Sequence, residues 1–204
     1  MIVGLNGIIQ GGVSVKDFSK VTQIDEDNSE KILNNFINTG IGNLKDDFYY
    51  FEDGDKLKIA IILLQNGFPL DEISIALDWR DFEGLTAEIL SSKNFAVIKN
   101  LMLTKPRMEI DVVGIRLGIA ILIDCKHWKR MSHYALETIV HKQIERVKHY
   151  VANTKVAIAA PVVVTLYQEE TSFVNRVPIV PILQFSSFID DFYGNLEDIR
   201  TIEK

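Results

Sequence analysis

Two short apolar segments, 108–115 and 119–125, restrict the fold of this chain more than any other feature. Both have the length of a β-strand and only a few residues separate them, so they predict an antiparallel hairpin. If Leu117-Gly118 forms a two-residue loop, Asp111 lies directly opposite Asp124. The loop is not of the favoured Asn-Gly type, so a register shifted by one residue stays open.

The same register divides the hairpin into a charged face and an apolar face, because side chains alternate between the two sides of a sheet. Glu109 would lie opposite Lys126, on the face that also carries Asp111 and Asp124. The opposite face would be filled by Ile110, Val112, Ile123 and Cys125. The sequence therefore predicts two facing carboxylates, with a lysine beside them, in an otherwise apolar hairpin.

Two aspartates that face each other need a compensating charge. Like charges directly opposite in a sheet are destabilising, and buried carboxylates are costly when unpaired. A divalent cation resolves both problems, and oxygen ligands of this kind suit Mg²⁺ or Mn²⁺. Lys126, on the same side, could orient or deprotonate an attacking water or stabilise negative charge on a phosphate. These residue types and spacings favour hydrolysis of a phosphodiester.

The run Glu109-Ile110-Asp111, followed by Asp124-Cys125-Lys126, resembles the Asp…(Asp/Glu)-x-Lys signature of the restriction-endonuclease-like nuclease superfamily, nearest to its Mrr-type and archaeal branches. The resemblance covers about residues 81–150. It implies a metal-dependent DNA endonuclease that uses Mg²⁺ or Mn²⁺. In that role Asp111, Asp124 and the main-chain carbonyl of Cys125 would bind the metal, and Lys126 would activate water.

The resemblance also assigns roles to residues on both sides of the hairpin. Upstream, Glu83 opens a predicted helix where related nucleases often carry a metal-binding glutamate. Glu88 is its rival, and a solvated acid in a first helical turn is an equally good interpretation. Downstream, Gln143 matches a glutamine that lies near the lysine and the DNA in Mrr-like and RecB-like branches. The RecB-like spacing to a tyrosine is not met, since Tyr150 follows too late.

The segment after the hairpin, Trp128-Lys129-Arg130, is a candidate nucleic-acid contact. The aromatic ring can stack on a base and the cations can hold phosphates, but the tryptophan could equally anchor the loop. The chain has a net charge of −6, which is awkward because phosphate contacts come mainly from Lys and Arg. Residues 126–148 nevertheless hold six basic residues against two acidic ones. A local basic face that binds DNA is therefore compatible with an acidic total.

The predicted elements around the hairpin alternate in type. The pattern predicts a helix over 81–92, strands over 95–98, 108–115 and 119–125, a helix over 133–151, strands over 157–167 and 177–185, and a helix from 186. The order helix, three strands, helix, strand predicts an α/β fold, in which a mixed sheet is flanked by helices. By the resemblance, this second domain, over 80–204, is a restriction-endonuclease-like catalytic core.

Residues 1–79 predict a small, mostly helical amino-terminal domain. A first helix would begin at Asn28 or Ser29, a second would cover 55–65 and a third would begin at Pro69. The last two have the outline of a helix-turn-helix. The would-be recognition helix, 69–78, carries three acidic residues and no basic one, which favours a packing module over a DNA reader.

Composition sets limits on location and assembly. No apolar run is long enough to span a bilayer, and the amino terminus lacks the features of a secretory signal. The single cysteine cannot form an internal disulfide, which suits a reducing cytoplasm. We therefore expect a cytoplasmic protein with no membrane partner, and a homodimer stays an open option.

Two function classes remain on these grounds. The first is a Mg²⁺-dependent deoxyribonuclease that hydrolyses phosphodiester bonds. The second is a non-catalytic module that binds nucleic acid or protein and retains the nuclease fold. The acidic total favours the second class, whereas the intact Asp111, Asp124 and Lys126 favour the first, because an abandoned site has no physical need for opposed carboxylates.

Overall fold

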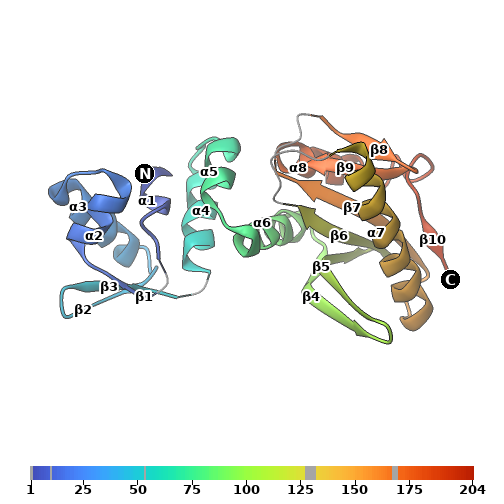
Figure 1. Ribbon diagram of the computed structural model, residues 1–204, viewed down its shortest axis with the longest axis horizontal. Coiled ribbons are helices and arrows are strands. Elements are labelled where there is room, and N and C mark those ends of the chain that lie inside the picture. Colours follow the sequence, from blue (N-terminus) through green and yellow to red (C-terminus); the bar gives the residue numbers. More distant parts are fainter. Residues whose placement is uncertain (1, 10, 53, 127–131, 167–169) are drawn as a thin grey trace. The chain divides into compact units, whose positions relative to one another are not determined.

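The computed structural model describes residues 2–9, 11–52, 54–126, 132–166 and 170–204. The chain divides into two compact units, Met1–Asp81 and Phe82–Lys204. The sequence placed a domain boundary between residues 79 and 80. Each unit has its own elements, which Figure 1 labels in chain order.

The first unit combines helices with a small sheet. Its helices are α1 (Ile2–Leu5), α2 (Val15–Thr22), α3 (Glu26–Asn38), α4 (Asp55–Gln65) and α5 (Leu70–Ala76), and its strands are β1 (Gly11–Val13), β2 (Asn43–Lys45) and β3 (Phe48–Phe51). The strands pair antiparallel in the order β1-β3-β2. The sequence suggested a short strand pair around Gly11-Gly12, where β1 lies. The expectation of a mostly helical domain missed β2 and β3, because these strands are too short to show a period of two. The predicted helix-turn-helix outline corresponds to α4 and α5.

Helix α3 begins earlier than the sequence predicted. Its cap is Asp25, whose carboxylate accepts a hydrogen bond from the Asn28 backbone N–H at 2.9 Å. Asn28 and Ser29, the expected caps, lie inside the helix. An aspartate at the cap satisfies one of the free N–H groups of the first turn and suits the positive end of the helix dipole.

The second unit is an α/β layer structure. Its elements are α6 (Trp79–Ser92, which begins in the first unit), β4 (Ala96–Thr104), β5 (Arg107–Arg116), β6 (Ile119–Lys126), α7 (His133–Asn153), β7 (Ile158–Thr165), β8 (Ser172–Val174), β9 (Val177–Pro181), α8 (Ile182–Asp191) and β10 (Ile202–Glu203). The strand order is β4-β5-β6-β7-β9-β8, and β10 pairs with the edge of β7. The β6–β7 and β7–β9 pairs are parallel and the others antiparallel. The sheet is therefore mixed, as the sequence predicted.

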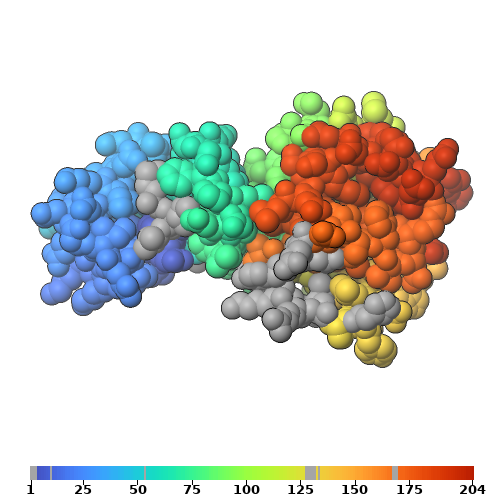
Figure 2. All heavy atoms as spheres, turned by 90° about the horizontal axis from the view of Figure 1, so that it is seen from above, coloured from blue at the N-terminus to red at the C-terminus, as the bar shows by residue number. Residues whose placement is uncertain are grey.

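Helices cover both faces of this sheet (Figure 1). Helix α7 packs through Val147 and Val151 against Val113 and Leu122. Helix α6 lies on the opposite face, where Leu90 meets Gly114, and Lys93 just after it forms an ion pair with Asp190 of α8. In the space-filling view the last part of the chain, in orange and red, forms a continuous surface of this unit (Figure 2).

Several boundaries differ from the sequence prediction, and β4 (Ala96–Thr104) continues well past the strand expected over 95–98. The expected strand over 177–185 ends at Pro181, because helix α8 begins at Ile182 and buries Phe185 as a helical residue. An apolar run does not reveal such a change from strand to helix.

Of the helices in the described residues, none has both the length and the apolar character needed to cross a bilayer.

The hairpin register is confirmed, and it contains a break that the sequence did not predict. Val112 pairs with Ile123 and Arg116 with Ile119. On the other side of β5, Lys99 pairs with Val112 and Leu101 with Ile110, but Asn100 and Asp111 between them do not pair.

The break changes which face Ile110 occupies. We expected Ile110 on the face opposite Asp111, together with Val112. Ile110 instead packs in the same cluster as Val113 and Val147, on the α7 side. Asn100 has a left-handed backbone (φ 52°), and this local irregularity shifts the alternation of side chains along β5 by one residue.

Replacing Gly114 with Val should lower the free energy of unfolding by about 1–3 kcal/mol, the usual cost of overpacking a core. A Cβ atom at this position would lie 2.9 Å from Leu90 Cδ1 and 3.3 Å from Phe95 Cδ1, so the side chains that seat α6 on the sheet would have to shift. Urea unfolding measures the change. The control is Gly118→Asn, at a left-handed position with open space around it, where Asn is tolerated. Equal stability of the two variants would contradict this account of how α6 is seated.

Candidate active site

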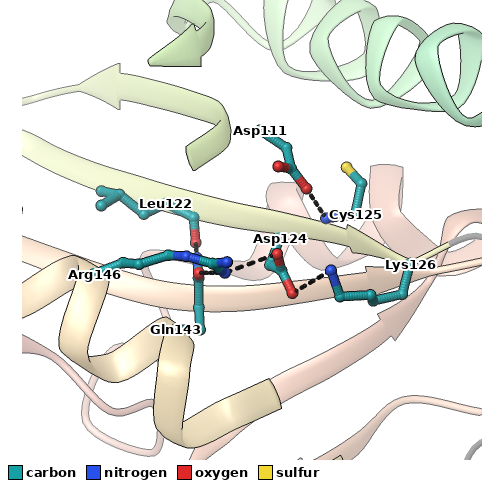
Figure 3. A network of polar contacts seen from close by, with 7 residues as sticks. All are labelled: Asp111, Leu122, Asp124, Cys125, Lys126, Gln143 and Arg146. Atoms are coloured by element: carbon teal, nitrogen blue, oxygen red, sulfur yellow. Dashed lines mark hydrogen bonds and ion pairs between the residues drawn. The ribbon is translucent and has the colours of Figure 1, made fainter. Parts of the chain in front are cut away.

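Asp111 lies just beyond the end of the β5–β6 ladder, at the one position that the β4–β5 ladder skips. It pairs with neither β4 nor β6, and its Oδ2 accepts a hydrogen bond of 2.7 Å from the backbone N–H of Cys125 (Figure 3). The side chain thus takes the place of a backbone acceptor beyond the end of the ladder. This contact ties Asp111 to the end of β6, but Asp111 does not pair opposite Asp124 as the predicted register required. We expected both aspartates on one face, whereas Figure 3 shows Asp111 on the side of the Cys125 thiol, and Asp124 with Lys126 on the side of Arg146.

The environment of Asp111 opposes its charge. Burial, the largest cause, and the neighbouring Asp124 charge raise the pKa of this carboxyl from 3.8 to about 6, against the Cys125 N–H, Lys126 and Arg146, which lower it. Two carboxylates close together cannot both ionise freely. The two predicted aspartates therefore do interact.

Asp124 is buried, with 2% of its surface exposed, and a cation faces each of its oxygens. Arg146 donates to Oδ1 at 2.9 Å, and the Lys126 Nζ lies 2.9 Å from Oδ2 (Figure 3). Oδ2 is not aligned for a hydrogen bond, so Lys126 acts on it mainly as a charge. A buried carboxylate is stable only when it is compensated in this way.

Gln143 holds Arg146 in place. Its side-chain amide donates to the Leu122 carbonyl at 2.8 Å, and its Oε1 accepts from Arg146 at 3.1 Å. Leu122 is a β6 residue opposite Pro161 of β7, so the bond from Gln143 fastens α7 to the backbone of β6. We expected Gln143 to touch DNA. Gln143 has no exposed surface and both ends of its amide are engaged. From this buried position it holds Arg146 against Asp124 instead.

Helix α6 brings Glu83, and not Glu88, to the site. Glu83 is 8% exposed, whereas Glu88 points to solvent. The Cys125 thiol contacts Thr86 of the same helix at 3.6 Å. Burial, then the charges of Asp111 and Glu83 among its neighbours, raise the pKa of this thiol well above its ordinary value. Cys125 is therefore a neutral packing residue between the hairpin and α6, as its predicted side implied.

The residues present fit a divalent cation in part. Asp111 and Asp124 supply two hard oxygen donors whose mutual repulsion a cation would relieve. The Cys125 backbone, a predicted third ligand, belongs to the β6–β7 pairing. In the part of the chain that the structure describes, no three His, Cys, Asp or Glu side chains converge closely enough to hold a metal. Glu83 is thus near the two aspartates without forming a set of three with them.

A groove adjoins this site on the α7 side. It has a volume of about 370 Å³ and is lined by Arg107, Met108, Glu109, His141, Lys142, Glu145 and Arg146. Arg146 belongs to both the groove and the Asp124 pair, and the sequence analysis gave it no role. The available signal was its position three residues after Gln143, which places both on one side of a helix. Trp128, Lys129 and Arg130 lie outside the described residues.

No protein-family model matches the chain. An uncharacterised protein of Archaeoglobus fulgidus is 29% identical over 124 residues, which are 59% of this chain and 95% of that protein. Two crystal structures are similar in part. The protein of unknown function AF1548 (19% identity) covers 43% of this chain with a TM-score of 0.33, and VC1899 from Vibrio cholerae (12% identity) covers 93% with a TM-score of 0.42. The chain spans about half the length of each, at 49% and 47%.

Replacing Asp111 with Asn should stabilise the metal-free protein at about pH 8 and have little effect at about pH 4. A folded-state pKa of about 6, above the ordinary 3.8, means that stability is complete below the unfolded-state pKa and is lost as the pH rises through about 6. The full shift corresponds to about 3 kcal/mol at ~1.4 kcal/mol per pKa unit. We expect about 1–2 kcal/mol after solvent screening. Asn can still accept the Cys125 N–H.

The measurement is urea unfolding in EDTA at both pH values. Glu109→Gln is the matched control, since Glu109 is an exposed acid on the same strand, and its effect should not depend on pH in this way. A stability difference for Asp111→Asn that is the same at both pH values would contradict the assigned environment.

Proposed function

We propose that this protein is a metal-dependent nuclease of the restriction-endonuclease-like type, which hydrolyses DNA phosphodiester bonds. One observation carries the proposal. The end of the β5–β6 hairpin brings Asp111, Asp124 and Lys126 together, and the two carboxylates are close enough for one to raise the pKa of the other. Carboxylates held this close repel each other, and ionisable groups with perturbed pKa values of this kind are typical of functional sites.

The chain's own residues divide the work as follows. Asp111 and Asp124 would hold a Mg²⁺ or Mn²⁺ ion, with Glu83 on α6 as the nearest further acid. Bound there, the ion would supply Lewis-acid polarisation of the scissile phosphate. The Lys126 ammonium, 21% exposed at its side chain, would orient the attacking water and stabilise negative charge on the phosphate. Gln143 and Arg146 would fix the position of Asp124.

A second candidate is a non-catalytic module that binds nucleic acid or protein. A specific observation favours it: both oxygens of Asp124 already face cations of the chain, so the fold compensates this charge without a metal. The net charge of −6 also weighs against tight phosphate binding. Binding of Mn²⁺ in calorimetry, lost on Asp111→Ala, separates the two candidates, since only the nuclease requires it.

Cleavage is the direct test of the nuclease. Purified protein should cut labelled duplex, single-stranded or four-way-junction DNA with Mg²⁺ or Mn²⁺, and not with EDTA. Asp111→Ala and Lys126→Ala should each lower the rate by on the order of a hundredfold or more, the usual loss when a group that stabilises transition-state charge is removed.

Lys155→Ala serves as the control, because Lys155 is an exposed lysine just before β7, at the Ile119 end of the β6–β7 pair and not at its Lys126 end, and it should keep the wild-type rate. Circular dichroism shows that each variant is folded. Undiminished cutting by both Asp111→Ala and Lys126→Ala would refute the assignment. Binding without cutting on every substrate would favour the non-catalytic module.

A further inference from the structure

Asp124 cannot bind a cation while both of its oxygens face basic side chains of the chain itself. Arg146 holds Oδ1 and Lys126 faces Oδ2, each at 2.9 Å. If the site takes a divalent ion, one of the two must leave. Lys126 is on the same strand, two residues along, whereas Arg146 reaches across from α7.

A groove lies beside Arg146, and its side chain can turn into it. Its side chain is 23% exposed, and it lines the groove of about 370 Å³ between β5 and α7. If the Arg146 side chain turned into this groove, its guanidinium would leave the Asp124 carboxylate and contact the other residues that line the groove. The backbone would not have to move. Gln143, which accepts from the same guanidinium, would remain beside it as a second acceptor.

The charged side chains that line the groove determine which group would bind the Arg146 guanidinium there. Arg107 and Lys142 line the groove together with Arg146, and of the two acids there, Glu145 is held by Lys148 at 2.8 Å, which lowers its pKa. Three cationic side chains then face one carboxylate, Glu109. A guanidinium entering such a space gains most when a phosphate group is present, because phosphate accepts from several basic donors at once.

We propose that Arg146 couples substrate and metal binding: it occupies Asp124 in the metal-free protein and transfers to a backbone phosphate of the nucleic acid in the β5–α7 groove, which frees Asp124 for the divalent cation. This inference rests on the proposed function and names how the same site is regulated. Coupling of this kind is reciprocal, so an anion in the groove tightens metal binding and the metal tightens anion binding.

The experiment titrates Mn²⁺ into the full chain by calorimetry, in chloride and in sulfate of equal ionic strength, with sulfate as a tetrahedral anion in place of phosphate. In chloride, Arg146→Ala should bind Mn²⁺ at least about fivefold more tightly than the wild type, because the competitor is gone. Lys155→Ala controls for the loss of an exposed positive charge just after the same helix and should match the wild type. In sulfate, the wild type should bind Mn²⁺ more tightly, and Arg146→Ala and Lys142→Ala should not respond.

Arg146→Met keeps the aliphatic stem, so it repeats the test if Arg146→Ala does not fold. Equal Mn²⁺ affinity of the wild type and the Arg146 variants would overturn the coupling while leaving the proposed nuclease intact. The same tightening in Lys155→Ala would also overturn it, since the effect would then be one of overall charge. Absence of Mn²⁺ binding by every variant would overturn the coupling and the proposed function together.

Discussion

The second unit depends on the compensation of one buried charge, the Asp124 carboxylate. With 2% of its surface exposed, it would cost several kcal/mol if it were unpaired. Lys126 and Arg146 supply the compensation from two different elements. Because the arginine comes from α7, the helix must pack on the sheet in a fixed register, and Gln143 secures that register through the Leu122 carbonyl. Apolar packing seats the helix, and this polar network specifies where it sits.

Asp111 shows how backbone irregularity creates a site. The break opposite Asn100 releases Asp111 from both ladders, and its side chain then binds the Cys125 N–H. A regular strand would have kept this position in the ladder. The break thus places a carboxylate at the end of β6, while the β4–β5 register is the same on both sides of it.

The sequence predicted what depends on local periodicity. The α/β class, the order of elements and the hairpin register follow from apolar runs and a short turn. The face of Ile110 could not be predicted, because it depends on Asn100 in a different strand. The end of β9 at Pro181 and the short strands of the first unit leave no periodic signal. Gln143 was singled out, but its orientation depends on the Leu122 carbonyl and on Arg146, contacts that only the packing of α7 on β6 reveals.

The charge of Asp111 distinguishes this cluster from an ion pair that only stabilises the fold. The fold needs an acceptor for the Cys125 N–H, and an asparagine would provide one without the repulsion that raises the pKa of Asp111 to about 6. The fold therefore gains nothing from the negative charge of Asp111 that a neutral asparagine would not also supply. Positions where a chain keeps a destabilising choice without structural need are those where function is to be sought. By contrast, the Asp124 pairs with Lys126 and Arg146 are explained by burial alone, so Asp111 carries the stronger argument for chemistry at this site.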